Sequence, residues 1–103
     1  MTVASAALTA LGDPTRQAII DRLRRGPAPV GVLAEELPVT RSAVSQHLKV
    51  LKEAGLVMDR QVGTRRLYSV EPQAVAELRA YFDAFWDQSL AAFRDAVEGD
   101  DAS

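Results

Sequence analysis

The sequence predicts a mainly α domain with one small β-hairpin, an α+β fold of about five helices. Three observations support this fold class. Apolar residues recur with the 3.6-residue period of an amphipathic helix, and capping residues bound several of these segments. After Gly55 the period changes to alternation, which is typical of strands. The pair Gly63-Thr64 divides this alternating stretch into two runs, as a hairpin requires.

The chain has 103 residues, of which 48% are hydrophobic, enough for one small core. We expect a single domain over residues 1–98 and a disordered tail at 99–103. There is no cysteine, which excludes disulfides and thiolate metal sites. The N-terminal MTVASAAL does not have the pattern of a signal peptide, and charges interrupt every apolar run. We therefore expect a cytoplasmic protein with no membrane partner.

The net charge of −2 is unevenly distributed along the chain. Residues 13–69 contain ten Lys or Arg against six Asp or Glu, a local charge of +4. Residues 70–103 contain two against eight, a local charge of −6. A basic middle and an acidic C-terminal third predict one region that faces nucleic acid and another that faces elsewhere.

The first two helices are predicted on either side of Gly12. Residues 3–11, VASAALTAL, are Ala-rich and apolar, and they predict a short helix that ends at this glycine. Asp13 can cap the next helix, with Pro14 at its first position. The buried stripe of this second helix is expected to contain Ala18, Ile19, Ile20 and Leu23, before Arg25-Gly26 ends it.

A tight pair of helices follows. GPAP at residues 26–29 predicts a stiff turn, and Val30 to Leu37 predicts a short helix that Pro38 closes. Its inward residues are expected to be Val30, Leu33, Ala34 and Leu37. Only the three residues PVT separate this helix from the next one, so the two must cross closely. This arrangement predicts a helix-turn-helix.

The second helix of this pair is predicted from Arg41 to Ala54. Thr40 can cap its start, and Gly55 can end it in the left-handed conformation. Helical spacing gathers Val44, Leu48 and Leu51 on the buried side. The opposite face is uncharged to basic and is expected to carry no carboxylate; it consists of Arg41, Ser42, Ser45, Gln46, Lys49 and Lys52.

These side chains suit the major groove of DNA. Gln can form two hydrogen bonds with adenine, Arg and Lys can reach guanine, and Ser is short enough to allow close approach. Lys49 and Lys52 add attraction to phosphates. A solvated polar face on an ordinary amphipathic helix is the alternative, and the helix alone does not decide between the two.

The flanking hairpin favours the DNA-binding interpretation. LVMDRQV and RRLYSV form its two strands, which carry Arg60, Arg65 and Arg66. A basic hairpin directly after a helix-turn-helix is a wing, whose arginines can lie along the DNA backbone or enter the minor groove. A hairpin with arginines for solubility is the alternative. The complete pattern predicts a winged helix-turn-helix.

The last helix is predicted from Pro72 to about Val97. Its apolar residues cover an arc of roughly 140°, and they are Val75, Leu78, Phe82, Phe85, Trp86, Leu90, Phe93 and Val97. Part of this stripe can pack on the core and on the first helix, and the remainder would be exposed unless a second chain covered it. We therefore expect a homodimer formed by the first and last helices. Its predicted interface residues are Leu8, Leu78, Phe82, Phe85, Trp86 and Phe93.

The segments LGDPTRQAIIDRLRRGP, VGVLAEELPVTRSAVSQHLKVLKEAGLV and RQVGTRRLYSV resemble the ArsR/SmtB family of winged-helix regulators. The resemblance covers about residues 8–70. It implies a bacterial dimeric repressor of transcription that binds a palindromic operator and releases it when a metal or another signal arrives. The metal-sensing members have a Cys-x-Cys pair, and the matching positions here are Pro29 and Gly31. Because His47 is the only histidine, we expect no metal site and no cofactor. A packing role or a phosphate contact is expected for His47.

The leading functional hypothesis is a sequence-specific DNA-binding transcriptional regulator. It would be a homodimeric repressor with the 41–54 helix in the major groove and the 57–70 wing on the flank. The alternative is a winged-helix module for protein interaction with only non-specific DNA affinity, although the predicted recognition face offers no apolar anchor. No catalytic constellation is present in the sequence, so we do not expect an enzyme. A small-molecule or protein effector stays open, with Tyr81, Phe85 and Trp86 as candidate lining residues.

Overall fold

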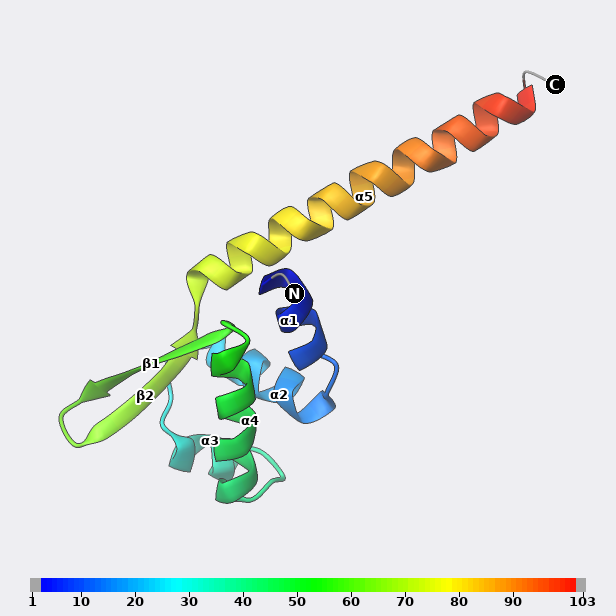
Figure 1. Ribbon diagram of the computed structural model, residues 1–103. Helices are drawn as coiled ribbons and strands as arrows, with labels where there is room; N and C mark the ends of the chain where they lie inside the picture. Colours follow the sequence, from blue (N-terminus) through cyan, green and yellow to red (C-terminus); the bar gives the residue numbers. More distant parts are fainter. Residues whose placement is uncertain (1–2, 102–103) are drawn as a thin grey trace.

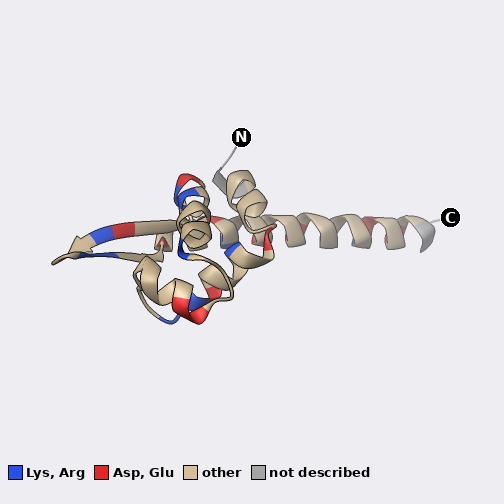
Figure 2. Ribbon diagram, turned by 90° about the horizontal axis from the view of Figure 1, so that it is seen from below, with Lys and Arg blue, Asp and Glu red and all other residues tan. Residues whose placement is uncertain are grey.

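The computed structural model describes residues 3–101. Its seven elements are, in chain order, α1 (Val3–Ala10), α2 (Pro14–Leu23), α3 (Val30–Glu36), α4 (Arg41–Glu53), β1 (Val57–Val62), β2 (Arg65–Val70) and α5 (Pro72–Asp101). Helices α1 to α4 form a compact body, and the hairpin and α5 extend from opposite sides of it (Figures 1 and 2). Five helices and one hairpin within this range confirm the predicted fold class, and each predicted boundary except the last lies within two residues of the observed one.

The core lies where α2, α3 and α4 meet the base of the hairpin. Its largest fully buried side chains are Ile19, Leu33, Val44, Leu48 and Leu51, at the helical positions that the apolar spacing predicts. One side of this core is completed by α1, which also packs against α5. The cluster as a whole consists of Ala7, Ala10, Ile19, Leu23, Ala28, Leu33, Val44, Leu48, Leu51, Leu56, Val57 and Ala74.

The hairpin has the predicted turn. Its strands are antiparallel, with Val57 opposite Val70 and Val62 opposite Arg65, so that Gly63 and Thr64 form a two-residue loop. Gly63 has a φ of 62°, and no non-glycine residue in the described range has a positive φ. Positive φ at the first loop residue only is the pattern of a type II′ turn, whose twist matches that of the two strands.

The sequence does not predict an isolated β-bridge that lies outside the two strands. Ala28 forms an antiparallel bridge with Tyr68, within the segment that we interpreted only as a stiff turn. Pro27 and Pro29 flank it, and proline disfavours a strand except at a sheet edge. The bridge attaches the base of the hairpin to the chain that enters α3.

Helix α5 is longer than predicted. It continues from Pro72 to Asp101 rather than ending near Val97. Gly99 does not end it, because this glycine does not adopt the left-handed conformation of a C-terminal cap. The prediction of a disordered tail at 99–103 is therefore wrong for its first three residues, and 102–103 lie outside the described residues. No helix within 3–101 is both long and apolar enough to cross a membrane.

Candidate nucleic-acid interface

Both ends of α4 are capped as the sequence predicts. At the start, Thr40 Oγ1 accepts a hydrogen bond of 3.1 Å from the Ala43 N–H. At the end, Gly55 has a φ of 80°. Its N–H donates to the Lys52 carbonyl, and the Leu56 N–H donates to the Leu51 carbonyl. These two bonds form a Schellman motif. Both ends of α4 are therefore fixed, and so is the set of side chains that the helix exposes.

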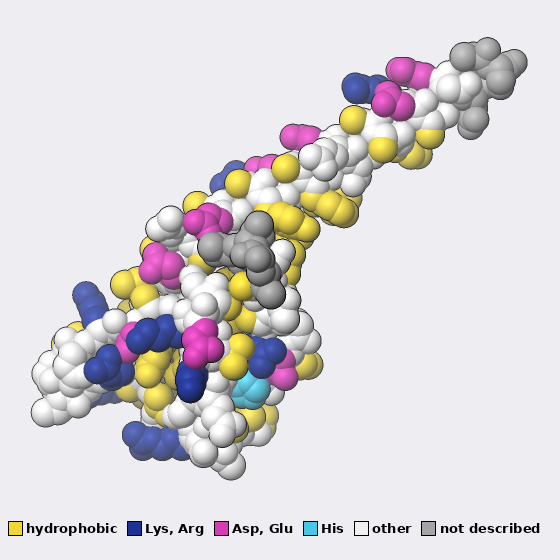
Figure 3. Space-filling model, viewed as in Figure 1, with side chains coloured by type: hydrophobic (Ala, Val, Ile, Leu, Met, Phe, Trp, Pro, Cys, Tyr) yellow, Lys and Arg dark blue, Asp and Glu magenta, His cyan; other side chains and the backbone are white. Residues whose placement is uncertain are grey.

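The two faces of α4 are separated as predicted. Val44, Leu48 and Leu51 are buried against the core. All six side chains of the predicted DNA-binding face are exposed, namely Arg41, Ser42, Ser45, Gln46, Lys49 and Lys52. Most of the Lys and Arg side chains visible in Figure 3 lie over the hairpin and the adjoining part of the body, although α5 also carries basic side chains, Arg94 among them.

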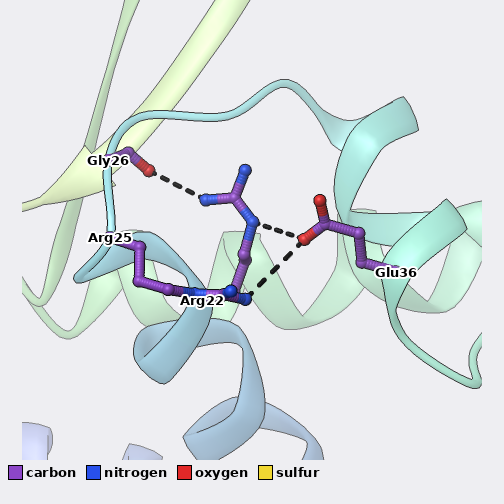
Figure 4. Close-up of polar contacts among 4 residues, drawn as sticks. All are labelled: Arg22, Arg25, Gly26 and Glu36. Carbon is purple, nitrogen blue, oxygen red and sulfur yellow. Dashed lines mark hydrogen bonds and ion pairs between the residues drawn. The ribbon is translucent and has the colours of Figure 1, made fainter.

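The position of α3 relative to α2 is held by a polar cluster. The Arg22 guanidinium pairs with the Glu36 carboxylate through Nε, and its Nη1 donates to the Gly26 carbonyl at 3.2 Å (Figure 4). Arg25 Nη2 lies 3.9 Å from the same Glu36 oxygen. The Arg22 side chain is only 16% exposed, so its pairing is better shielded from solvent than an ordinary surface ion pair. This cluster fixes the first helix of the helix-turn-helix on the body.

The wing places its three predicted arginines in solvent. Arg60, Arg65 and Arg66 are all exposed. An open groove of about 470 Å³ separates the wing from the start of α3 and α4. Arg41, Arg65 and Arg66 line it together with Glu35 and Tyr68. The wing and the first residues of α3 therefore form the two sides of this groove, and Arg41 at the start of α4 borders it, so the groove and the exposed face of α4 adjoin in one mainly basic surface.

The outer face of α4 itself carries no carboxylate, as expected, but a carboxylate of the wing reaches its edge. Asp59 of β1 forms ion pairs with Lys52 Nζ of α4 at 2.7 Å and with Arg66 Nη1 of β2 at 2.5 Å. Its side chain is 8% exposed, whereas those of Lys52 and Arg66 are 55% and 53% exposed. Hydrogen bonds from Lys52 and then from Arg66 lower the pKa of Asp59 below its ordinary value. Two of the predicted phosphate-binding cations are thus already paired.

The sequence carries no local signal for this pairing, because it depends on the strand register and on how α4 packs against β1. Among the described residues, no ion pair engages the other four cations of the surface, which are Arg41, Lys49, Arg60 and Arg65. These four therefore carry the unpaired positive charge of the surface.

His47 lies on the inner edge of α4, partly buried. Its Nδ1 is 3.5 Å from Arg16 Nη1, and Arg16 Nε donates to the Ala10 carbonyl at 2.5 Å. This contact supports a packing role over a phosphate contact. Within residues 3–101 no three His, Cys, Asp or Glu side chains lie together as metal ligands would.

The apolar stripe of α5 divides into a packed and an exposed part. Ala74 is buried and Leu78 is half-buried against the core, while Leu8 of α1 is also half-buried. Beyond Tyr81 the stripe faces solvent, and its most exposed aromatic side chains are Trp86 at 59% and Phe93 at 70%. Hydrophobic atoms accordingly follow one side of the projecting helix (Figure 3).

The effector cavity that we considered is not formed in the single chain. Tyr81, Phe85 and Trp86 are 42%, 49% and 59% exposed, so they do not enclose a ligand between α5 and the core. They instead form edge-to-face aromatic contacts along the helix, between Tyr81 and Phe82 and between Phe85 and Trp86.

A capped recognition helix, a preceding short helix and a basic hairpin define a winged helix-turn-helix protein of the nucleic-acid-binding class. Comparison with known proteins agrees with this class. Residues 11–60 match the family model of a helix-turn-helix domain. The chain is 54% identical over 94 residues to the HTH-type transcriptional regulator Rv2034 of Mycobacterium tuberculosis, and the match covers 89% of this chain and 88% of that protein.

Two solved structures extend the comparison. The ArsR-like transcriptional regulator from Rhodococcus sp. RHA1 superposes with a TM-score of 0.76 at 31% identity, covering 90% of this chain and 91% of that one. The homodimeric winged helix-turn-helix DNA-binding domain of a possible ArsR-family regulator from Mycobacterium bovis superposes with a TM-score of 0.68 at 31% identity, covering 85% and 82%. The chain belongs to the ArsR/SmtB family of winged helix-turn-helix transcriptional regulators.

Proposed function

We propose that the chain is a sequence-specific DNA-binding repressor that acts as a homodimer on a palindromic operator. The observation that carries this proposal is the exposed face of α4. It presents Ser42, Ser45, Gln46 and Lys49 between two well-capped helix ends, beside a basic wing. Short hydroxyls, an amide and a lysine on a rigid helix are the groups that read base edges in the major groove. We assign no catalytic step and no cofactor to the protein.

The unpaired cations divide by position. Arg41 and Lys49 lie on the recognition helix, within reach of bases and of the nearest phosphates. Arg60 and Arg65 lie on the wing, where they would contact flanking phosphates or the minor groove. Lys52 and Arg66 retain exposed outer surfaces and would contact phosphates only while shared with Asp59.

The homodimer is proposed from the exposed part of α5. A row of half-exposed aromatic side chains on one side of a projecting helix is rare in a stable monomer. A second copy would cover this row, and the relative from Mycobacterium bovis is a homodimer. The proposed interface contains Leu8, Leu78, Phe82, Phe85, Trp86 and Phe93. Two-fold symmetry would place the two α4 helices in successive major grooves, roughly 34 Å apart.

Selection from a pool of random duplex DNA tests the proposal. The purified chain is incubated with the pool, bound fragments are recovered over several rounds, and the recovered fragments are sequenced. We expect an enriched inverted repeat with half-sites about one helical turn apart. If no sequence is enriched and binding disappears at moderate salt, the surface gives only non-specific attraction, and a protein-interaction module becomes the better interpretation.

A further inference from the structure

Asp59 occupies the point where the recognition helix and both strands of the wing meet. Strand register places it opposite Tyr68, and Arg66 precedes Tyr68 by two residues in β2, so it lies on the same face of the hairpin. Lys52 reaches the same carboxylate from the last turn of α4. One nearly buried anion therefore holds a cation from the recognition helix and a cation from the wing.

The geometry has an electrostatic consequence. Lys52 and Arg66 alone would offer two positive charges to the DNA backbone, and with Asp59 the group offers a net charge of +1. Non-specific affinity grows with the number of phosphates that a protein neutralises, whereas discrimination depends on contacts with base edges. A carboxylate at this place reduces the non-specific affinity for phosphates and leaves the contacts with base edges intact.

The arrangement also has a mechanical consequence. The wing otherwise joins the body at its base, through the strand ends and the bridge to Ala28. The pair between Lys52 and Asp59 adds a link from β1 to the side of α4. Such a link restricts the angle between the wing and the recognition helix. It thereby also restricts the positions along one duplex that the two can contact at the same time.

We propose that Asp59 is a specificity-determining positioning residue, which orients the wing against the recognition helix and withholds Lys52 and Arg66 from full contact with DNA phosphates. This inference rests on the proposed DNA-binding function. In this role Asp59, a carboxylate within a basic surface, raises the affinity for the operator relative to the affinity for random DNA.

The principal test replaces the charge and keeps the shape, with Asp59→Asn. Binding to a selected operator and to a random duplex is measured by fluorescence anisotropy between 50 and 200 mM salt. Release of both cations adds up to two phosphate contacts per protomer, or four per dimer, so the loss of random-DNA affinity over this salt range should become up to about a hundredfold greater for the proposed dimer. Random-DNA affinity at low salt should rise, and the preference for the operator should fall. Structural damage alone would weaken binding to random DNA, whereas release of the two cations should strengthen it. The sign of the change in random-DNA affinity therefore distinguishes the two explanations.

A matched control is Asp21→Asn. Asp21 is an exposed carboxylate on α2 that pairs only with Arg24 in the described part of the chain, so its replacement makes the same change in net charge outside the wing network. It should leave both the salt dependence and the operator preference close to those of the unmodified chain. A salt dependence that is unchanged or shallower in Asp59→Asn would overturn the proposal.

A second pair of variants keeps the test valid if Asp59→Asn does not fold. Lys49 and Lys52 lie on the same helix, and of the two only Lys52 forms an ion pair within residues 3–101. Lys49→Gln should reduce the salt slope by about 0.9 per protomer, the value for one phosphate, and Lys52→Gln should reduce it by clearly less. Equal reductions of the salt slope in the two variants would contradict the proposal that Asp59 withholds Lys52 from DNA phosphates.

A measurement without DNA separates this proposal from the proposed function. The chain has no native cysteine, so spin labels can be attached at Gln61→Cys on the wing and Glu53→Cys on α4. The distance distribution between them should broaden in Asp59→Asn and not in Asp21→Asn. An unchanged distribution would overturn the positioning role. If the unmodified chain binds no duplex, the proposed function fails and this measurement still decides whether Asp59 orients the wing.

Discussion

Ala28 and Tyr68 exchange two backbone hydrogen bonds, of 3.0 Å from the Ala28 N–H and 2.9 Å from the Tyr68 N–H. Ala28 is only 1% exposed, so these bonds are shielded from water. Through them the base of the wing is joined to the residues that enter α3. The helix-turn-helix and the wing are thus connected by backbone as well as by side chains.

Ala28→Pro should detach the base of the wing. Proline has no N–H, so the Tyr68 carbonyl loses its partner, at a cost of about 1–3 kcal/mol in the free energy of unfolding. Urea unfolding measures this loss, and hydrogen exchange should show faster exchange of the β2 amides. Ala28→Gly keeps both hydrogen bonds and should cost about 0.5–1 kcal/mol with little change in exchange. Similar protection in the two variants would show that the bridge does not hold the wing.

Gln46→Ala should relax sequence preference. A side chain that makes two hydrogen bonds with one base contributes about 1–3 kcal/mol of discrimination, roughly a 5- to 150-fold change in the ratio of operator to random affinity for each half-site that the dimer reads. Competition binding with both duplexes measures this ratio. Arg65→Ala, on the wing, should weaken binding to both duplexes and reduce the salt slope. Equal losses on both duplexes for Gln46→Ala would show that Gln46 does not read a base.

Trp86→Glu should dissociate the proposed homodimer. An interface tryptophan commonly contributes 2 kcal/mol or more, so the dimer dissociation constant should rise about 30-fold or further. Analytical ultracentrifugation over a range of concentrations measures it. Gln88→Glu introduces the same charge on another side of α5 and should leave the dimer intact. Dimers of equal strength in both variants would place the interface elsewhere.

Asp13 makes stability depend on pH in the acid range. Its Oδ1 accepts hydrogen bonds from the N–H groups of Arg16 and Thr15, and these bonds hold its folded pKa below the ordinary value of 3.8. The stabilisation is complete above pH 3.8 and is lost as the pH falls through the folded pKa. Asp13→Asn keeps an acceptor for the helix start but cannot titrate.

The comparison is a series of thermal melts of both proteins from pH 7 to pH 2. The difference between their melting temperatures should shrink or reverse towards low pH, because only the unmodified chain loses an ionised cap. Taking the difference cancels the contribution of Asp59, whose pKa is also lowered. A difference that stays constant across this range would argue against a lowered pKa of Asp13.

Local chemistry explains which parts of the fold were predictable. Asp13-Pro14, Thr40 and Gly55 act on the backbone within a few residues, and each has the capping role that its residue type indicates. The buried stripes follow from helical spacing in the same way. The polar face of α4 could be predicted equally well, because it lies on the side of the helix opposite the buried stripe.

The unpredicted features depend on partners far apart in the chain. The bridge between Ala28 and Tyr68 joins a proline-flanked turn to a strand, and the turn alone gives no sign of a strand partner. The pairing of Asp59 requires the register of two strands and the packing of a helix on them. Helix α5 continues beyond its predicted end near Val97 and through Gly99, which stays helical although glycine is common at helix ends.

The projecting helix α5 would link gene control to the amount of protein. If its row of aromatic side chains is covered only by a second copy, the DNA-binding species forms from two chains rather than one. Below the dimer dissociation constant, doubling the amount of chain would then raise the concentration of dimers about fourfold. Operator occupancy would respond to synthesis with a threshold, and the apolar contacts of Phe85, Trp86 and Phe93 would set the level at which that threshold lies.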